Sequence, residues 1–66
     1  MNTARMVRIL ENELKCTASE AYDVLTDAQA FGILPKEQET TLEEFIKEIR
    51  RWPGNLRGLL RELKEW

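Results

Sequence analysis

The sequence predicts an all-α fold, a small orthogonal bundle of about four helices forming one domain over residues 1–66. Apolar residues recur at intervals of three and four along most of the chain, the spacing that places them on one helix face. Two Thr-x-x-Glu sequences, beginning at Thr17 and Thr41, have the form of capping boxes that open helices. No segment shows the alternation of apolar and polar residues that a half-buried strand needs, so we expect helices to pack only against helices.

The first helix is expected over residues 3–15, with Thr3 as its N-cap. Its apolar stripe includes one charged residue, Glu13. The apolar residues of this stripe are Met6, Ile9, Leu10 and Leu14. The second helix is expected to start at Thr17 and to end at Gly32, because a residue without Cβ readily adopts the left-handed conformation that closes a helix.

Ile33 follows at the position where a Schellman cap makes its hydrophobic contact. Residues 34–40 are expected to form a short loop, because Pro35 disfavours helical geometry at the residue before it. A third helix follows, Pro53 must stop or kink it, and a fourth begins near Pro53 or Asn55. The expected apolar faces are Leu42, Phe45, Ile46 and Ile49 on the third helix, and Leu56, Leu59, Leu60 and Leu63, continued by Trp66, on the fourth.

The composition is that of a folded protein, with 33% charged and 42% hydrophobic residues among 66. The net charge of -2 is unevenly placed, because residues 16–44 carry one basic and seven acidic groups and residues 45–66 carry six and three. This polarity suits docking on an oppositely charged protein surface or on a second copy, head to tail, and is also consistent with a solvated surface. A chain of this length buries only about 60% of the surface that it exposes when unfolded. Self-association would therefore add stability.

The sequence contains no catalytic or cofactor-binding pattern. It has no histidine to act as a general base at neutral pH and no glycine-rich phosphate loop. Cys16, the only cysteine, is expected to plug the core, although a helix N-terminus at this position would lower its pKa. We therefore expect no enzyme, no metal and no cofactor. The absence of a run of about 20 apolar residues predicts no membrane span, and the single cysteine indicates the reducing cytoplasm.

The stretch LENELKCTASEAYDVL, residues 10–25, resembles the helix-turn-helix of DNA-binding regulators, and the resemblance extends over residues 6–34. It implies a helix-turn-helix-like first half of the chain, as in tri-helical regulator domains, whose second helix would enter the major groove of DNA. Two residues depart from the pattern: Lys15 stands where the turn prefers glycine, and Glu11 where the first helix prefers a small residue. The apolar positions of the pattern are taken by Leu10, Leu14, Cys16, Ala21, Val24 and Leu25.

The second helix is acidic on the face that a recognition helix would present to DNA. Glu20, Asp23 and Asp27 share this face, because they are spaced three and four residues apart. Carboxylates directed at phosphates are repelled, whereas affinity for DNA comes chiefly from Lys and Arg side chains. We therefore expect that this helix does not read DNA.

Two hypotheses for the function remain. The first is a small non-enzymatic regulatory or recruitment domain that binds a partner protein, or a second copy, through the apolar face of its last helices. Its expected anchors are Trp52, Leu60, Leu63 and Trp66. The alternative is a helix-turn-helix-like DNA-binding regulator that contacts nucleic acid through basic side chains of the last two helices, namely Lys47, Arg50, Arg51, Arg57, Arg61 and Lys64.

Overall fold

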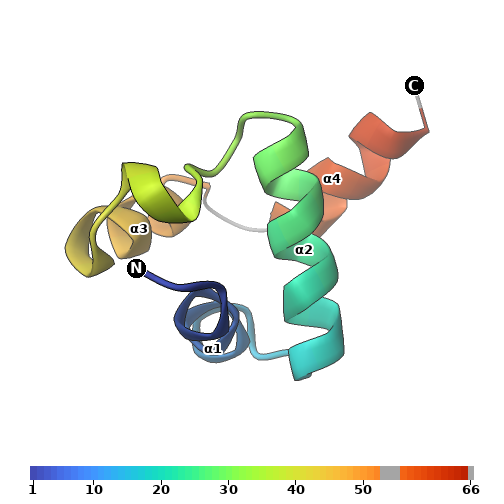
Figure 1. Ribbon diagram of the computed structural model, residues 1–66. Helices are drawn as coiled ribbons and strands as arrows, with labels where there is room; N and C mark the ends of the chain where they lie inside the picture. Colours follow the sequence, from blue (N-terminus) through green and yellow to red (C-terminus); the bar gives the residue numbers. More distant parts are fainter. Residues whose placement is uncertain (53–55, 66) are drawn as a thin grey trace.

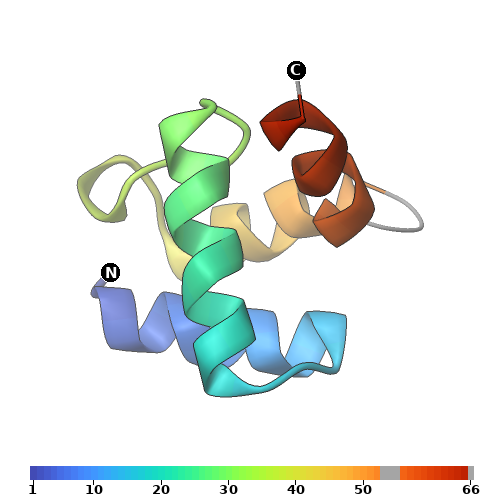
Figure 2. The ribbon, with the colours of Figure 1, turned by 90° about the vertical axis from the view of Figure 1, so that its right-hand side faces the viewer.

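The computed structural model describes residues 1–52 and 56–65, which contain helices and no strand, as the all-α prediction requires. Figure 1 shows α2 upright at the centre of the bundle with α3 on one side and α4 on the other, and Figure 2 shows α1 crossing near the lower end of α2 at a steep angle. Helices α1 and α4 both contact α2, and α3 contacts α1. The elements are α1 (Thr3–Leu14), α2 (Ala18–Ala30), the short 3-10 helix η1 (Glu37–Glu39), α3 (Leu42–Arg50) and α4 (Leu56–Lys64).

The N-cap of α1 is Asn2, not Thr3 as predicted. The Asn2 side chain accepts a hydrogen bond from the backbone N–H of Arg5 at 2.8 Å. The Thr3 hydroxyl instead donates to the carboxylate of Glu37 in η1, so it is engaged in a tertiary contact. Asn is as good an N-cap as Thr, and the choice between the neighbours depends on this contact, which is distant in sequence.

Helix α1 ends in a left-handed residue that is not glycine. Lys15 has φ 55° and ψ 51°, and its N–H donates to the carbonyl of Glu11. The left-handed conformation costs a residue with a Cβ about 1–2 kcal/mol. The position where the helix-turn-helix pattern prefers glycine is therefore the position where this backbone turns left-handed.

Helix α2 begins and closes as its sequence predicts. The Thr17 hydroxyl accepts from the backbone N–H of Glu20 at 3.2 Å. At the other end Gly32 has φ 74°, its N–H donates to Gln29 at 3.2 Å, and the N–H of Ile33 donates to Ala28 at 2.8 Å. These two bonds form a Schellman motif, which fixes the direction in which the chain leaves α2.

Two predictions for the residues between α2 and the end of α3 were wrong. The predicted loop at residues 34–40 contains η1, and Leu42, predicted to be buried, is 42% exposed. Leu42 is the first residue of α3, and the helix reaches the core only at Phe45, almost one turn later. Thr41 caps α3 as predicted, because its hydroxyl accepts from Glu44 N–H at 3.4 Å. The predicted start of the fourth helix near Pro53 or Asn55 lies outside the described residues.

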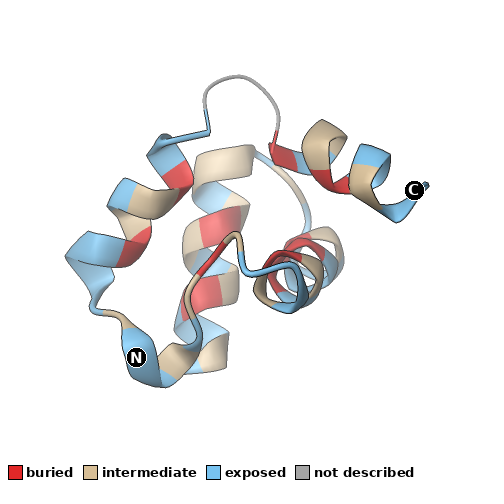
Figure 3. Cartoon of the chain, turned by 90° about the horizontal axis from the view of Figure 1, so that it is seen from above, coloured by how far each residue is buried: buried red, intermediate tan, exposed pale blue. Residues whose placement is uncertain are grey.

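The core collects residues from every α-helix and from the chain after α2. Figure 3 shows the buried positions on the helix faces that turn toward one another. Phe45 is the largest fully buried side chain, and half-buried Leu14 and Cys16 pack against the cluster. The buried apolar residues are Met6, Leu10, Ala21, Val24, Leu25, Ala28, Leu34, Phe45, Ile49, Leu56 and Leu60.

We expect Lys15→Gly to raise the free energy of unfolding by about 0.5–1 kcal/mol, because relief of the left-handed strain exceeds the entropy gained by the unfolded chain. The matched control is Lys36→Gly, since Lys36 is an exposed lysine with an ordinary φ of -77°. That substitution should lower stability. Urea unfolding measures both variants, and equal losses of stability would contradict the left-handed geometry at Lys15.

Candidate functional site

The acidic face of α2 and the basic stripe of α4 lie against each other. Lys64 Nζ is 2.6 Å from a carboxylate oxygen of Asp27, and the Arg57 guanidinium pairs with Glu20. Two sets of charges that the sequence presents as separate surfaces therefore neutralise each other inside one chain. Between the helices lies a groove of about 220 Å³, lined by Glu20, Asp23, Val24, Asp27, Arg57, Leu60, Arg61 and Lys64.

The two ion pairs match in register. The carboxylates are seven residues apart on α2 and the cations are seven residues apart on α4, which is two helical turns in each case. The pairing therefore aligns the two helices in the same direction along this contact. Leu56 and Leu60 lie buried on the inner side of α4, so the ion pairs flank an apolar contact.

This contact uses the face that a recognition helix would present to DNA. The remaining outer face of α2 carries Tyr22, which is 55% exposed, with Ser19 and Thr26. It has no basic side chain, and Asp23 borders it. DNA reading by α2 is thus disfavoured sterically as well as electrostatically, because α4 already covers part of the surface of α2.

Two further predicted nucleic-acid contacts are also paired within the chain. Arg50 Nη2 lies 2.9 Å from Oε1 of Glu13, which explains why a charged residue interrupts the apolar stripe of α1. Arg51 Nη1 lies 3.1 Å from Oε1 of Glu48, its neighbour on α3. Of the six predicted cations, only Lys47 and Arg61 form no ion pair within the described part of the chain.

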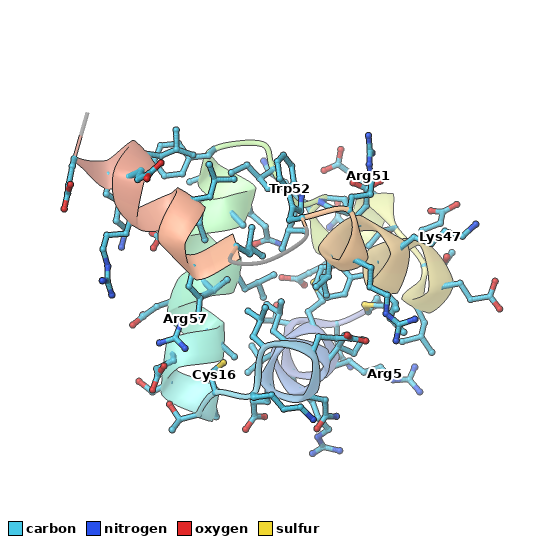
Figure 4. All side chains as sticks on the ribbon, turned by 180° about the vertical axis from the view of Figure 1, so that it is seen from behind. Arg5, Cys16, Lys47, Arg51, Trp52 and Arg57 are labelled. Carbon is cyan, nitrogen blue, oxygen red and sulfur yellow. The ribbon has the colours of Figure 1, made fainter. Side chains whose placement is uncertain are left out.

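The predicted apolar anchors are distributed between core and surface. Trp52 is 39% exposed and projects from the end of α3 beside Arg51, as Figure 4 shows. Leu63 is half-buried. Leu60 is only 3% exposed, so its assignment to an exposed interface needs correction: it belongs to the core. Trp66 lies outside the described residues.

A second groove, of about 600 Å³, lies between residues 32–40 and α3. It was not predicted from the sequence. Its position depends on the Schellman turn after α2 and on η1, and neither element alone predicts a concave surface. The only local signal was the pair Glu44 and Glu48, spaced one turn apart on the polar side of α3. The lining residues are Gln29, Gly32, Ile33, Leu34, Pro35, Lys36, Glu39, Thr40, Glu44 and Glu48.

Cys16 lies at the turn between α1 and α2, half-buried against the core. Burial raises the pKa of its thiol, Arg57 opposes the rise, and Glu20 and Glu11 add to it. The thiol therefore forms less of the reactive thiolate at neutral pH than a free cysteine does. Within residues 1–52 and 56–65, no three His, Cys, Asp or Glu side chains converge to hold a metal ion.

The comparisons with known proteins give no relative: no protein-family model, no curated protein and no solved structure matches the chain. Among the described helices, none combines the length and the hydropathy that crossing a bilayer requires.

We expect the double-mutant cycle of Glu20→Arg and Arg57→Glu to give a coupling free energy of about 0.5–1 kcal/mol, because the swapped charges restore an attraction that either single reversal turns into repulsion. The value stays small because both side chains are nearly half exposed. Urea unfolding of the four proteins measures it. Glu20→Arg combined with Lys47→Glu, on the distant α3, is the matched control and should show no coupling. Zero coupling in the first cycle would contradict the contact between α2 and α4.

Proposed function

We propose that this chain is a small non-enzymatic interaction domain that binds a partner protein through a surface around Trp52. The observation that carries the proposal is the 39% exposure of this tryptophan at the end of α3. Tryptophan is enriched among the residues that dominate binding energy at protein interfaces, because one side chain buries a large area at a small cost in conformational entropy. An exposed Trp in so small a protein supports a role in recognition.

The charges favour a protein partner over nucleic acid. Affinity for nucleic acid requires cations that are free to replace the counterions of phosphates. Here Arg50, Arg51, Arg57 and Lys64 each lie beside a carboxylate of the same chain, and the negative charge of that carboxylate lowers the positive potential that would attract a phosphate. The alternative of a DNA-binding regulator therefore has the weaker support.

A heterologous partner has more support than pairing through α4. Much of the apolar face of α4 is buried in the core of the same chain, because Leu56 and Leu60 are buried. Only Leu59 and Leu63 remain half-buried among the leucines of this helix. The area left for a second α4 is small, whereas Trp52, at the end of another helix, is 39% exposed.

The test is capture of binding partners from a nuclease-treated extract of the source cells on the immobilised chain. We expect a protein to be retained in stoichiometric amount and Trp52→Ala to reduce its retention at least about tenfold, because truncation of a central anchor costs 2 kcal/mol or more. Tyr22→Ala is the matched control, since Tyr22 is a more exposed aromatic on a different helix, and should change retention less than about twofold.

Two results would contradict the proposal. One is retention that Trp52→Ala and Tyr22→Ala reduce equally. The other is tight binding of a random DNA duplex at physiological salt, measured by fluorescence anisotropy, which would restore the nucleic-acid alternative. The proposal predicts at most weak duplex binding that is lost steeply as salt is raised.

A further inference from the structure

We propose that the groove between residues 32–40 and α3 binds a basic amphipathic helix of the partner protein. This inference rests on the proposed function and deepens it, because it names a groove beside α3, the helix that precedes Trp52, and the chemistry of the segment that occupies it. The groove of about 600 Å³ is large enough to accept several side chains of a docked helix.

Three apolar residues, Ile33, Leu34 and Pro35, form the part of the lining called the floor here, and hydrogen bonds hold this segment in place. Half-buried Ile33 and Pro35 flank the buried Leu34. The backbone N–H groups of Ile33 and Leu34 both donate to the carbonyl of Ala28, at 2.8 and 3.2 Å, and Gln29 Nε2 donates to the carbonyl of Pro35 at 3.2 Å. A floor fixed in this way loses little conformational freedom when a ligand binds.

The wall formed by α3 is acidic and ends in an aromatic residue. Glu44, Glu48 and Trp52 follow one another at four-residue intervals, the spacing that keeps them on one edge of a helix. The N–H of Trp52 donates to the carbonyl of Ile49 at 3.2 Å, so the helical turn continues past the last residue of α3. Figure 4 shows Trp52 and Arg51 at this end of the helix. The two carboxylates that line the groove and Trp52 therefore follow one another along α3.

The charges of the groove select a cationic ligand. Glu39, Glu44 and Glu48 line it, and Lys36 is the one basic residue among the lining side chains. Glu44 forms no ion pair within the described part of the chain, and Glu48 pairs with Arg51, whose side chain is 71% exposed. A pair so exposed to water is weak, and a second cation displaces it at little cost.

The spacing of the carboxylates favours a helix as the ligand. Glu44 and Glu48 are one turn apart, about 6 Å along the axis of α3. A partner helix with Lys or Arg at positions i and i+4 presents cations at the same interval, and its apolar stripe then meets the floor. Nucleic acid is excluded from this surface by repulsion between phosphates and carboxylates.

A second copy of the chain fits less well. Its exposed cations on α1 are Arg5 and Arg8, but the apolar stripe of α1 is used in the core, where Met6 and Leu10 are fully buried. A second copy that docks through α1 would therefore bring charge to the groove without apolar side chains for its floor. A separate amphipathic segment supplies both.

The test uses the full chain and a fluorescein-labelled peptide of lysine and leucine in helical register, about 14 residues or four helical turns long. A peptide with glutamate in place of lysine is the charge control. We expect saturable binding of the lysine peptide at physiological salt, measured by anisotropy, with amide shifts in the NMR spectrum concentrated at Ile33, Glu44 and Glu48. We expect Glu44→Lys to weaken binding about tenfold.

The matched control variant is Glu43→Lys, an exposed neighbour on the same helix that lies outside the groove lining, and it should change the dissociation constant less than about twofold at a Debye length of about 8 Å. Circular dichroism confirms that both variants fold. Equal effects of the two variants, equal binding of the glutamate peptide, amide shifts confined to other surfaces, or self-association that the Glu44 variant abolishes would each overturn the inference. Retention of a cellular partner that depends on Trp52, without binding of the lysine peptide, would overturn this inference alone and leave the proposed function standing.

Discussion

The contact between α4 and the acidic face of α2 determines which surfaces of this protein are left for binding. It buries Leu56 and Leu60, and it places Arg57 beside Glu20 and Lys64 beside Asp27. A chain of 66 residues has few apolar residues to bury, so the contribution of α4 to the core is a substantial part of its stability. The flanking ion pairs are exposed and contribute little energy, but their matched spacing selects one register for α4.

This contact also bears on the two functions that the sequence allows. A helix-turn-helix regulator needs its second helix free on the outer side, and here α4 covers part of that side. The cations that would compensate for the acidic helix lie beside carboxylates of the same chain, as Arg50 and Glu13 also show. The groove beside α3 instead brings the apolar residues after α2 together with the carboxylates of α3. That combination suits a basic protein segment.

The local features of the fold could be predicted from the sequence because their causes are local. The caps at Thr17 and Thr41 and the Schellman turn at Gly32 depend on residues within a few positions. Asn2 and Thr3 are both good caps, and a contact to Glu37 decided between them. Periodicity placed Leu60 on the apolar face of its helix, but only the packing of α4 on α2 showed that this residue faces the core. The pairing of basic and acidic stripes and the groove beside α3 both depend on contacts between distant segments, so the sequence showed their charged residues but not that these come together.

The contact between α2 and α4 can be tested most directly by zero-length cross-linking. A carbodiimide joins a carboxylate to an amine only when the two groups touch, and Lys64 Nζ is 2.6 Å from Asp27. Peptide mass spectrometry of the monomeric product should identify an amide bond between Asp27 and Lys64, and raised salt should reduce its yield because the pair is partly exposed. A monomer in which Lys64 is linked only to other carboxylates, or an Asp27–Lys64 bond found only between two chains, would contradict this account of the fold.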